Sequence, residues 1–381
     1  MNNTTDTFIT LLRCAVTGTH EDLDLSEVNF EALYTLSRFH DLAHIVFFEL
    51  RNRIDQWQGE IFRKFEQQYN MALYRAVKRD LAINQIQMVL ENAGIPFILL
   101  KGAYLMKLYP ETWMRTSSDI DVLVEPSKHQ KAVEVLEESG FLFLKETPHD
   151  VSFQTQEKYH VELHHSLVEE GRLPKTAEIL ERVWQYTTLI DNCYERTIND
   201  EMQYFYHLAH MAKHLKNGGC GVRFFLDLWL LNHNTQFDAN KRDELISKSG
   251  LFIFAKQSLQ LSEKWFTPVN DEDDLSEFEE YVVRGGIYGS LESSVTIRKN
   301  RAKSRFLYYI NRIFLPYKKI MYLYPVLKKY PILLPPCWVL RWFKLLNPKT
   351  RQHAIEEAKA ESRIDSESVV RVERLMEQLK I

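Results

Sequence analysis

Cysteine is scarce in this sequence of 381 residues, and its four cysteines lie far apart. Cys14, Cys193, Cys220 and Cys337 form no C-x-x-C pair, so the sequence offers neither a disulfide framework nor a cysteine-ligated zinc site. This usage is typical of a protein that stays in a reducing compartment such as the cytoplasm.

Long apolar runs, internal repeats and low-complexity tracts are also absent. The longest apolar stretch, 331–346, is interrupted by Pro335, Pro336 and Arg341, and no run reaches the 18 apolar residues of a membrane span. The first residues lack the basic region and apolar run of a signal peptide. We therefore expect a cytoplasmic protein without a transmembrane helix, with peripheral membrane association as an alternative.

Acidic residues are missing from one long segment. Residues 293–355 contain no Asp or Glu but 14 Lys and Arg and 11 aromatic residues, although the whole chain has a net charge of -4. Such a segment suits nucleic acid, an anionic membrane surface, another polyanion or a phosphorylated acceptor. The structural alternative is a basic face that packs against the acidic segment 270–280.

Hydrophobic periodicity predicts an α+β protein, and the length predicts more than one core. We expect an N-terminal helical region over 1–93, with a long helix over 58–92, and a small mixed sheet with helices over 94–170. A second helical region over 171–292 and a basic aromatic C-terminal region over 293–381 follow. Within residues 94–170, strands are predicted at 97–100, 120–124, 141–144, 151–155 and 159–163, and helices at 102–108 and 127–138.

Two carboxylates open the predicted strand 120–124. Because side chains alternate along a strand, Asp119 and Asp121 share one face, while Ile120, Val122 and Val124 face a core. Adjacent acids repel each other, and a divalent cation is the usual counter-charge. A solvated acidic pair at a loop end is the simpler alternative.

The strand 97–100 ends at Lys101-Gly102 and leads into a predicted helix. Backbone N–H groups at such a turn suit a phosphate, glycine permits a close approach, and Lys101 adds a charge. A plain strand-to-helix turn with an exposed lysine is the alternative.

Together these elements predict a two-metal phosphoryl-transfer site. Asp119 and Asp121 would bridge two Mg²⁺ (or Mn²⁺) ions, and Glu162, on the strand 159–163, would hold the catalytic ion and draw an incoming hydroxyl toward ionisation. Arg115 is a candidate contact for a triphosphate. Ser117 and Ser118 either share that role or cap the turn.

These residues carry a resemblance to a known group of enzymes. The run Leu100-Lys101-Gly102, Arg115, Ser118-Asp119-Ile120-Asp121 and Val161-Glu162-Leu163-His164 resembles the DNA polymerase beta-type nucleotidyltransferase superfamily, and in particular its uncharacterised bacterial nucleotidyltransferase family. Lys101-Gly102-Ala103 stands where the superfamily has glycine-serine, so either Lys101 replaces the serine at the terminal phosphates or nucleotide affinity is lower.

The resemblance implies a metal-dependent nucleotidyltransferase. Such an enzyme moves a nucleoside monophosphate from an NTP, ATP among the candidates, to an acceptor hydroxyl and releases pyrophosphate; the acceptor stays unknown. Two alternatives remain: a non-catalytic nucleotide-binding or toxin/antitoxin-type regulatory module, and a membrane-surface partner in polysaccharide assembly.

Polar residues in the predicted helices 201–216 and 222–232 are further candidates. His207, His210 and His214 lie on one helix face, which either faces the active-site cleft, packs in a core or contributes to a zinc site. Arg223 and Asp227, one turn apart, either pair with each other or contact substrate. His164 either orients substrate or merely ends a strand.

Overall fold

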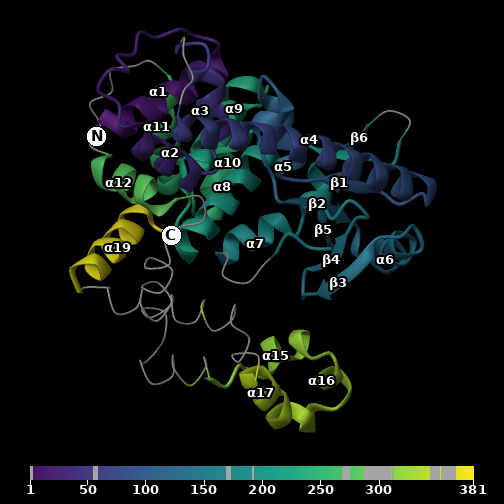
Figure 1. Ribbon diagram of the computed structural model, residues 1–381. Coiled ribbons are helices and arrows are strands. Elements are labelled where there is room, and N and C mark those ends of the chain that lie inside the picture. Colours follow the sequence, from purple (N-terminus) through teal and green to yellow (C-terminus); the bar gives the residue numbers. More distant parts are fainter. Residues whose placement is uncertain are drawn as a thin grey trace.

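The computed structural model describes residues 3–54, 59–168, 173–190, 193–267, 275–286, 310, 313–343, 352 and 366–381. Helices surround a five-stranded mixed sheet, which confirms the predicted α+β class (Figure 1). The predicted division of the chain into four regions stays a prediction.

Four helices precede the sheet, as the periodicity predicts. They are α1 (Asn3–Thr17), α2 (Phe30–Phe39), α3 (Ala43–Leu50) and the long α4 (Glu60–Asn92). Asn29 caps α2, because its side chain accepts a hydrogen bond from the Ala32 N–H. The buried stripe of α4 runs through Ala82, Ile83 and Ile86, whereas Leu81, which helical spacing also placed in this stripe, is 49% exposed.

The sheet contains β1 (Phe97–Leu99), β2 (Asp119–Val124), β3 (Leu142–Glu146), β4 (Asp150–Gln154) and β5 (His160–His164). The strand order is β1-β2-β5-β4-β3, with β2 and β5 parallel and the other pairs antiparallel. All five strands were predicted, with boundaries that differ by one or two residues. The central parallel pair β2–β5 brings the two carboxylate-bearing strands together.

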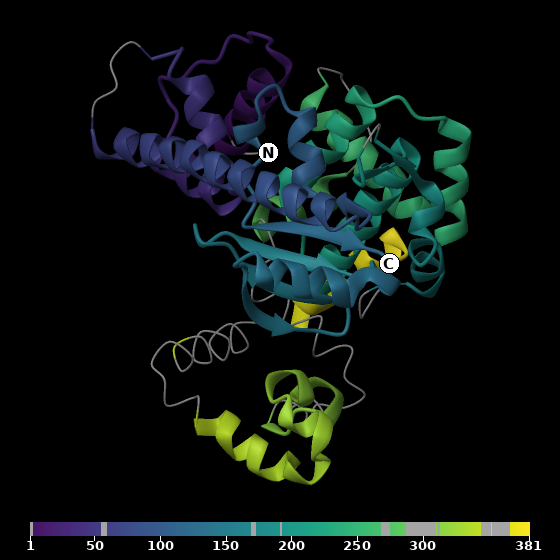
Figure 2. The same cartoon turned by 90° about the vertical axis from the view of Figure 1, so that its right-hand side faces the viewer.

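One face of the sheet is covered by α4 and by α6 (His129–Glu138), and α4 runs along the sheet in Figure 2. Ile120, Val122 and Val124 lie in this core, as their alternation along β2 predicts. The alternate residues of β2 therefore project toward the opposite face, where the later helices lie.

Two predicted helices differ from the structure. The helix predicted over 102–108 is α5 (Gly102–Leu105) followed by a 3₁₀ turn (Met106–Leu108), because Tyr109 precedes Pro110 and adopts an extended backbone. The helix predicted over 127–138, with Ser127 as its expected cap, begins later: Ser127 lies inside the 3₁₀ turn Pro126–Lys128, and α6 begins at His129.

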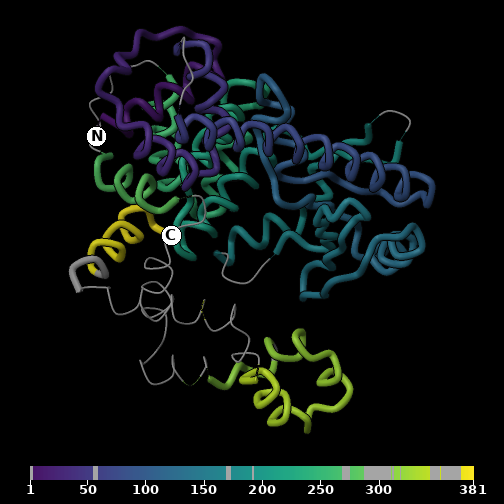
Figure 3. The backbone as a smooth tube through the Cα atoms, in the orientation of Figure 1, coloured from purple at the N-terminus to yellow at the C-terminus, as the bar shows by residue number. Residues whose placement is uncertain are grey.

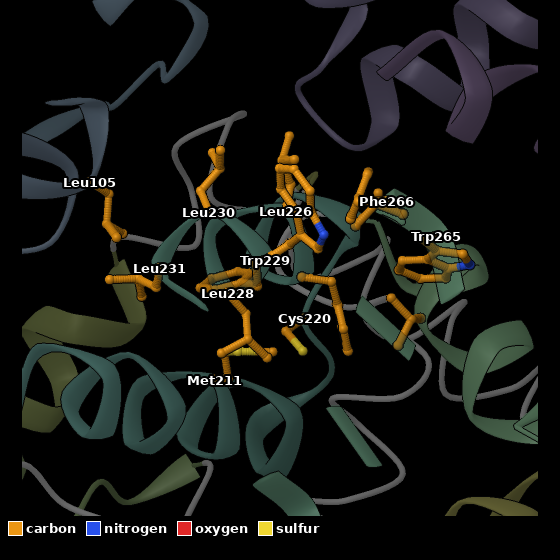
Figure 4. Close-up of a cluster of buried hydrophobic side chains, with 14 of the residues drawn as sticks. Leu105, Met211, Cys220, Leu226, Leu228, Trp229, Leu230, Leu231, Trp265 and Phe266 are labelled. Atoms are coloured by element: carbon orange, nitrogen blue, oxygen red, sulfur yellow. The ribbon is translucent and has the colours of Figure 1, made fainter. Parts of the chain in front are cut away.

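The later helices pack on the opposite side of the sheet from α4, and in Figure 3 the yellow α19 lies beside the green α12. The helices are α7 (Pro174–Leu180), α8 (Asp200–Asn217), α9 (Val222–Asn234), α10 (Ala239–Ser249), α11 (Phe252–Phe266), α12 (Ser276–Gly285) and α19 (Ser366–Leu379). Their apolar side chains share one core with α1 and α3. Figure 4 shows part of it, including Met211, Leu228, Trp265 and Cys220.

A small hairpin interrupts the region that was predicted to be helical. It consists of β6 (Thr187–Leu189) and β7 (Arg196–Ile198), and Glu195 forms a bridge with Phe97 next to β1. Three-residue strands are too short to leave an alternating pattern, so periodicity could not predict them.

The described part of the basic aromatic region forms a small helical unit: α15 (Tyr317–Leu323), α16 (Val326–Lys329) and α17 (Leu334–Phe343). Ile320, Leu327 and Cys337 are its buried core. The start of that region, 293–309, and the first part of the acidic segment 270–280, residues 270–274, lie outside the described residues. No helix in the described ranges is both long enough and apolar enough to cross a membrane.

Candidate functional site

The three carboxylates lie on adjacent strands and on one face of the sheet. In the parallel register of β2 and β5, Asp121 is opposite Glu162 and Asp119 is opposite His160. All three carboxylates line a cleft of about 230 Å³ between the sheet and the helices α8 and α9. The alternation along each strand and the register between strands therefore place them together.

Lys101 provides the nearest positive charge. Its Nζ lies 2.7 Å from Asp121 Oδ1, and its backbone has φ 44° and ψ -113°. A positive φ is unfavourable for a residue with a Cβ, costing about 1–3 kcal/mol. This local strain accompanies a lysine side chain that turns into the cleft, so Lys101 is not the exposed lysine of a plain turn.

The electrostatics of the site shift the pKa values of Asp121 and Glu162 in opposite directions. Burial alone would raise the pKa of Asp121, but Lys101 and His164 outweigh it and hold that pKa well below its usual range. Burial raises the pKa of Glu162, and the neighbouring Asp121 carboxylate raises it further. Asp121 is thus held as an anion, whereas Glu162 retains a proton more readily than an ordinary glutamate.

His164 joins the carboxylates from the end of β5. Its Nε2 lies 2.8 Å from Asp121 Oδ1 and 3.6 Å from Glu162 Oε2, and the side chain is buried. His164 is therefore a partner of Asp121 and more than a polar strand end.

The turn before β2 is held by short polar contacts. Ser117 Oγ donates a hydrogen bond of 2.6 Å to the Asp119 carbonyl, and Tyr159 Oη donates one of 2.7 Å to the Ser117 carbonyl. A Cβ on Gly102 would lie only 3.0 Å from Ser117 Oγ. Glycine at position 102 thus allows the two turns to approach each other, while Ser118 lines the cleft beside them.

The arginines at the cleft are paired with residues on other elements. Arg115 Nε donates to both carboxylate oxygens of Asp227, at 2.8 and 3.0 Å, and Tyr109 Oη donates to Asp227 Oδ1 at 2.8 Å. Arg223 Nη1 lies 2.8 Å from Asp41 Oδ2. The expected ion pair between Arg223 and Asp227 is therefore wrong, because their helix faces are buried and each side chain finds a partner across an interface.

The three histidines of α8 play different structural parts. His207 Nε2 lies 2.9 Å from the Phe224 carbonyl, and burial lowers its pKa, so it packs as a neutral side chain. His210 and His214 line the cleft with their Nε2 atoms 3.0 Å apart. Within the part of the chain that the structure describes, none of these histidines joins a three-ligand cluster that could hold zinc.

Sequence reasoning missed several residues of the cleft, among them Asp150, Gln203 and Lys213. Asp150 is opposite His164 in the β4–β5 register. Gln203 and Lys213 follow the spacing of three and four residues that the cleft-facing histidines of α8 already display, which is the signal that would have found them. Lysine on a helix is normally solvated, so residue type alone argued against Lys213.

The carboxylates fit a divalent metal ion. Asp119, His160 and Glu162 form one group whose potential ligand atoms all lie within 4.8 Å of one another, and Asp121, Glu162 and His164 form a second. Carboxylate oxygens are the ligands that Mg²⁺ and Mn²⁺ prefer. The donor set is appropriate, with Lys101 neutralising part of its charge.

One family model and one solved structure are similar to this chain. No curated protein sequence matches the chain. A solved structure titled "Solution Structure of Antibiotic-Resistance Factor ANT(2'')-Ia Reveals Substrate-Regulated Conformation Dynamics" is similar at 12% identity, over 50% of this chain and 97% of that one, with a TM-score of 0.34, too remote for any functional argument. The family model described as uncharacterised nucleotidyltransferase matches residues 26–267, more than half of the sequence. The chain therefore belongs to the uncharacterised nucleotidyltransferase family and is a transferase.

Proposed function

We propose that this enzyme transfers a nucleoside monophosphate from an NTP to an acceptor hydroxyl in a metal-dependent reaction of the DNA polymerase beta type. The observation that carries the proposal is the parallel register that sets Asp121 beside Glu162, with Asp119 on the same face. Family membership supports nucleotidyl transfer in general.

Asp119, Asp121 and Glu162 would hold Mg²⁺ or Mn²⁺ in this proposal, in line with the general use of divalent metals by nucleotidyltransferases. The bound ion supplies charge neutralisation and polarisation of the phosphoryl oxygens.

The residues around the carboxylates then take separate tasks. Lys101 positions the phosphates, which Gly102 allows to approach the backbone closely. Arg115 and Ser118 line the same cleft. The acceptor oxygen forms a bond to the α-phosphorus while the bond to the pyrophosphate oxygen breaks. Glu162, whose pKa is raised by burial and by Asp121, is suited to take the proton of the acceptor hydroxyl.

A mass-spectrometric screen tests this function. The enzyme is incubated with cell extract, Mg²⁺ and the four NTPs, and products are searched for added AMP, GMP, CMP or UMP. We expect Asp121→Asn and chelation to abolish the product, whereas Glu138→Gln, which changes an exposed carboxylate on α6, leaves it unchanged. Nucleotide binding that is equally tight in chelator and in Mg²⁺, without any product, would instead favour a non-catalytic anion pocket.

We also propose that the unit formed by residues 313–343 associates with an anionic membrane surface. It carries no acidic residue, and it exposes apolar side chains beside its lysines; Ile332 is 84% exposed, and Leu323 and Phe343 are also exposed. Apolar groups that enter the headgroup region next to cations are the usual basis of such binding.

Vesicle flotation distinguishes this surface from a solvated basic face. The intact protein is expected to float with vesicles that contain anionic lipid, to stay behind with neutral ones, and to dissociate as salt rises. Ile332→Ser should weaken flotation without affecting the fold, since Ile332 is exposed. Release from the vesicles by a soluble polyanion but not by salt would argue for a nucleic-acid or other polyanion site instead.

A further inference from the structure

One face of α8 spans the whole cleft. Near its beginning, Asp200 Oδ1 accepts a hydrogen bond of 3.0 Å from Tyr104 Oη, on the helix that follows the Lys101 turn. Near its end, Lys213 interacts electrostatically with Asp121, Glu162 and Asp150, on β2, β5 and β4. The Lys213 end of the helix thus faces the strands β2, β5 and β4, with Lys101 also nearby.

The far end of this face is rich in groups that favour an anion. His210 and His214 lie with their Nε2 atoms 3.0 Å apart, and their rings pack against Phe224 of α9 with centroid distances of 5.8 and 5.1 Å. Lys213, on the same helix face, is partly buried beside them. Burial and the nearby Lys101 lower the pKa of Lys213 to about 8, although Asp121, Glu162 and Asp150 act in the opposite direction.

The cleft also contains buried polar atoms that have no hydrogen-bond partner among the described residues. They are Asp150 Oδ1, Gln203 Nε2 and Arg223 Nε. Gln203 is 4% exposed and Arg223 5% exposed, so water does not readily satisfy these two side chains. Buried polar groups are normally paired, and unpaired groups that line one cavity mark a place for a polar ligand.

We propose that the acceptor is a small hydroxyl compound that carries a phosphate or carboxylate group, bound by Lys213, His210 and His214. The hydroxyl then points to Glu162, and Asp150 accepts a hydrogen bond from another hydroxyl of the same molecule. Because the nucleotide shares this cleft of about 230 Å³, the acceptor is small. This inference rests on the proposed nucleotidyl transfer, because it places the acceptor on the Glu162 side of the site.

Matched pairs of probes test the ligand class. Glycerol is compared with glycerol 3-phosphate and with glycerate, and ribose with ribose 5-phosphate, by calorimetry in the presence of Mg²⁺ and a non-hydrolysable NTP analogue. We expect at least one charged member to bind and its neutral counterpart to bind about tenfold more weakly or not at all, as for a charge-assisted hydrogen bond. The phosphate and carboxylate members show which anion is preferred.

Two lysine variants on the same helix separate the site from general charge effects. Lys213→Met should weaken binding of the charged probe about tenfold and leave the affinity for the NTP analogue unchanged. Lys216→Met removes the same charge from α8 but lies outside the cleft lining, so it should behave as wild type. If Lys213→Met weakens the NTP analogue instead, Lys213 is a triphosphate ligand and the inference is overturned.

The remaining outcomes are also decisive. Charged probes that bind in a Lys213-dependent way without any transfer product would support the ligand class while counting against the proposed reaction. Wild-type enzyme that binds no charged probe, or binds neutral members equally well, would overturn the inference even if the screen of cell extract reveals a nucleotidylated product.

Discussion

Replacing Lys101 by methionine tests whether its ammonium is the internal counter-ion of the carboxylates. Asp121 is only 5% exposed at its side chain, and Lys101 Nζ lies 2.7 Å from it. Without the ammonium, His164 is the remaining partner shown for this carboxylate, at 2.8 Å. A buried charge that has lost its main partner destabilises the folded state strongly.

The magnitude follows from the burial of the two partners. Breaking a buried pair from one side costs about 3–5 kcal/mol. Because the Lys101 side chain is 19% exposed, we expect the lower end, about 3 kcal/mol of unfolding free energy at pH 7 in chelator. Adding Asp121→Asn to Lys101→Met removes the stranded charge, so the double variant should recover about 2 kcal/mol of that loss.

Metal provides the second half of the test. A cation that binds only the folded state stabilises it by about 2.7 kcal/mol when its concentration is 100 times its Kd. Mg²⁺ should therefore restore most of the stability of Lys101→Met and add less to wild type, in which the ammonium already neutralises Asp121.

Urea denaturation followed by circular dichroism measures the free energy of unfolding of wild type, Lys101→Met and the double variant. Each protein is measured with Mg²⁺ and with chelator. A loss below about 0.5 kcal/mol for Lys101→Met would refute the counter-ion argument, since that is the range of ordinary surface changes. Equal stabilisation of wild type and variant by Mg²⁺ would refute the competition between ammonium and metal.

Three shorter predictions concern the same site. Lys101→Ala should weaken NTP binding more than AMP binding in equilibrium dialysis, and an equal effect would make the lysine structural. The pKa of Glu162 is raised in the folded state, so its ionisation lowers the stability of the fold as pH rises from about 4.3 through that raised pKa. Glu162→Gln should therefore stabilise the metal-free protein to urea at pH 7 but not at pH 4. Gly102→Ala should lower transfer activity by displacing Ser117, and adding Ser117→Ala should restore part of it in product assays.

The elements that could be predicted are those with a local pattern. Asp119 and Asp121 share a face because they are two residues apart on a strand, and the apolar residues between and after them identify the buried side. Sequence alone places Glu162 only on some strand. Its position opposite Asp121 depends on the β2–β5 register, which arises from strand order in the whole sheet.

The contacts that could not be predicted join distant segments. The spacing of Arg223 and Asp227 on one helix favours a local pair, but both side chains point into interfaces where Asp41 and Arg115 reach them. Lys213 was missed for a similar reason. Its partial burial depends on how α8 lies over the sheet, and no local pattern encodes that position.

These distant contacts bear on how much of the chain makes the site. Thr116 Oγ1 and Arg223 Nη1 both donate to Asp41 Oδ2 at 2.8 Å, while Arg115 beside Thr116 is held by Asp227. The turn that leads into the carboxylate strand is thus fixed from the N-terminal helices and from α9 at once. A sheet with its own helices would lack both supports, which agrees with a family model that begins at residue 26 and extends to 267, well beyond the strands themselves.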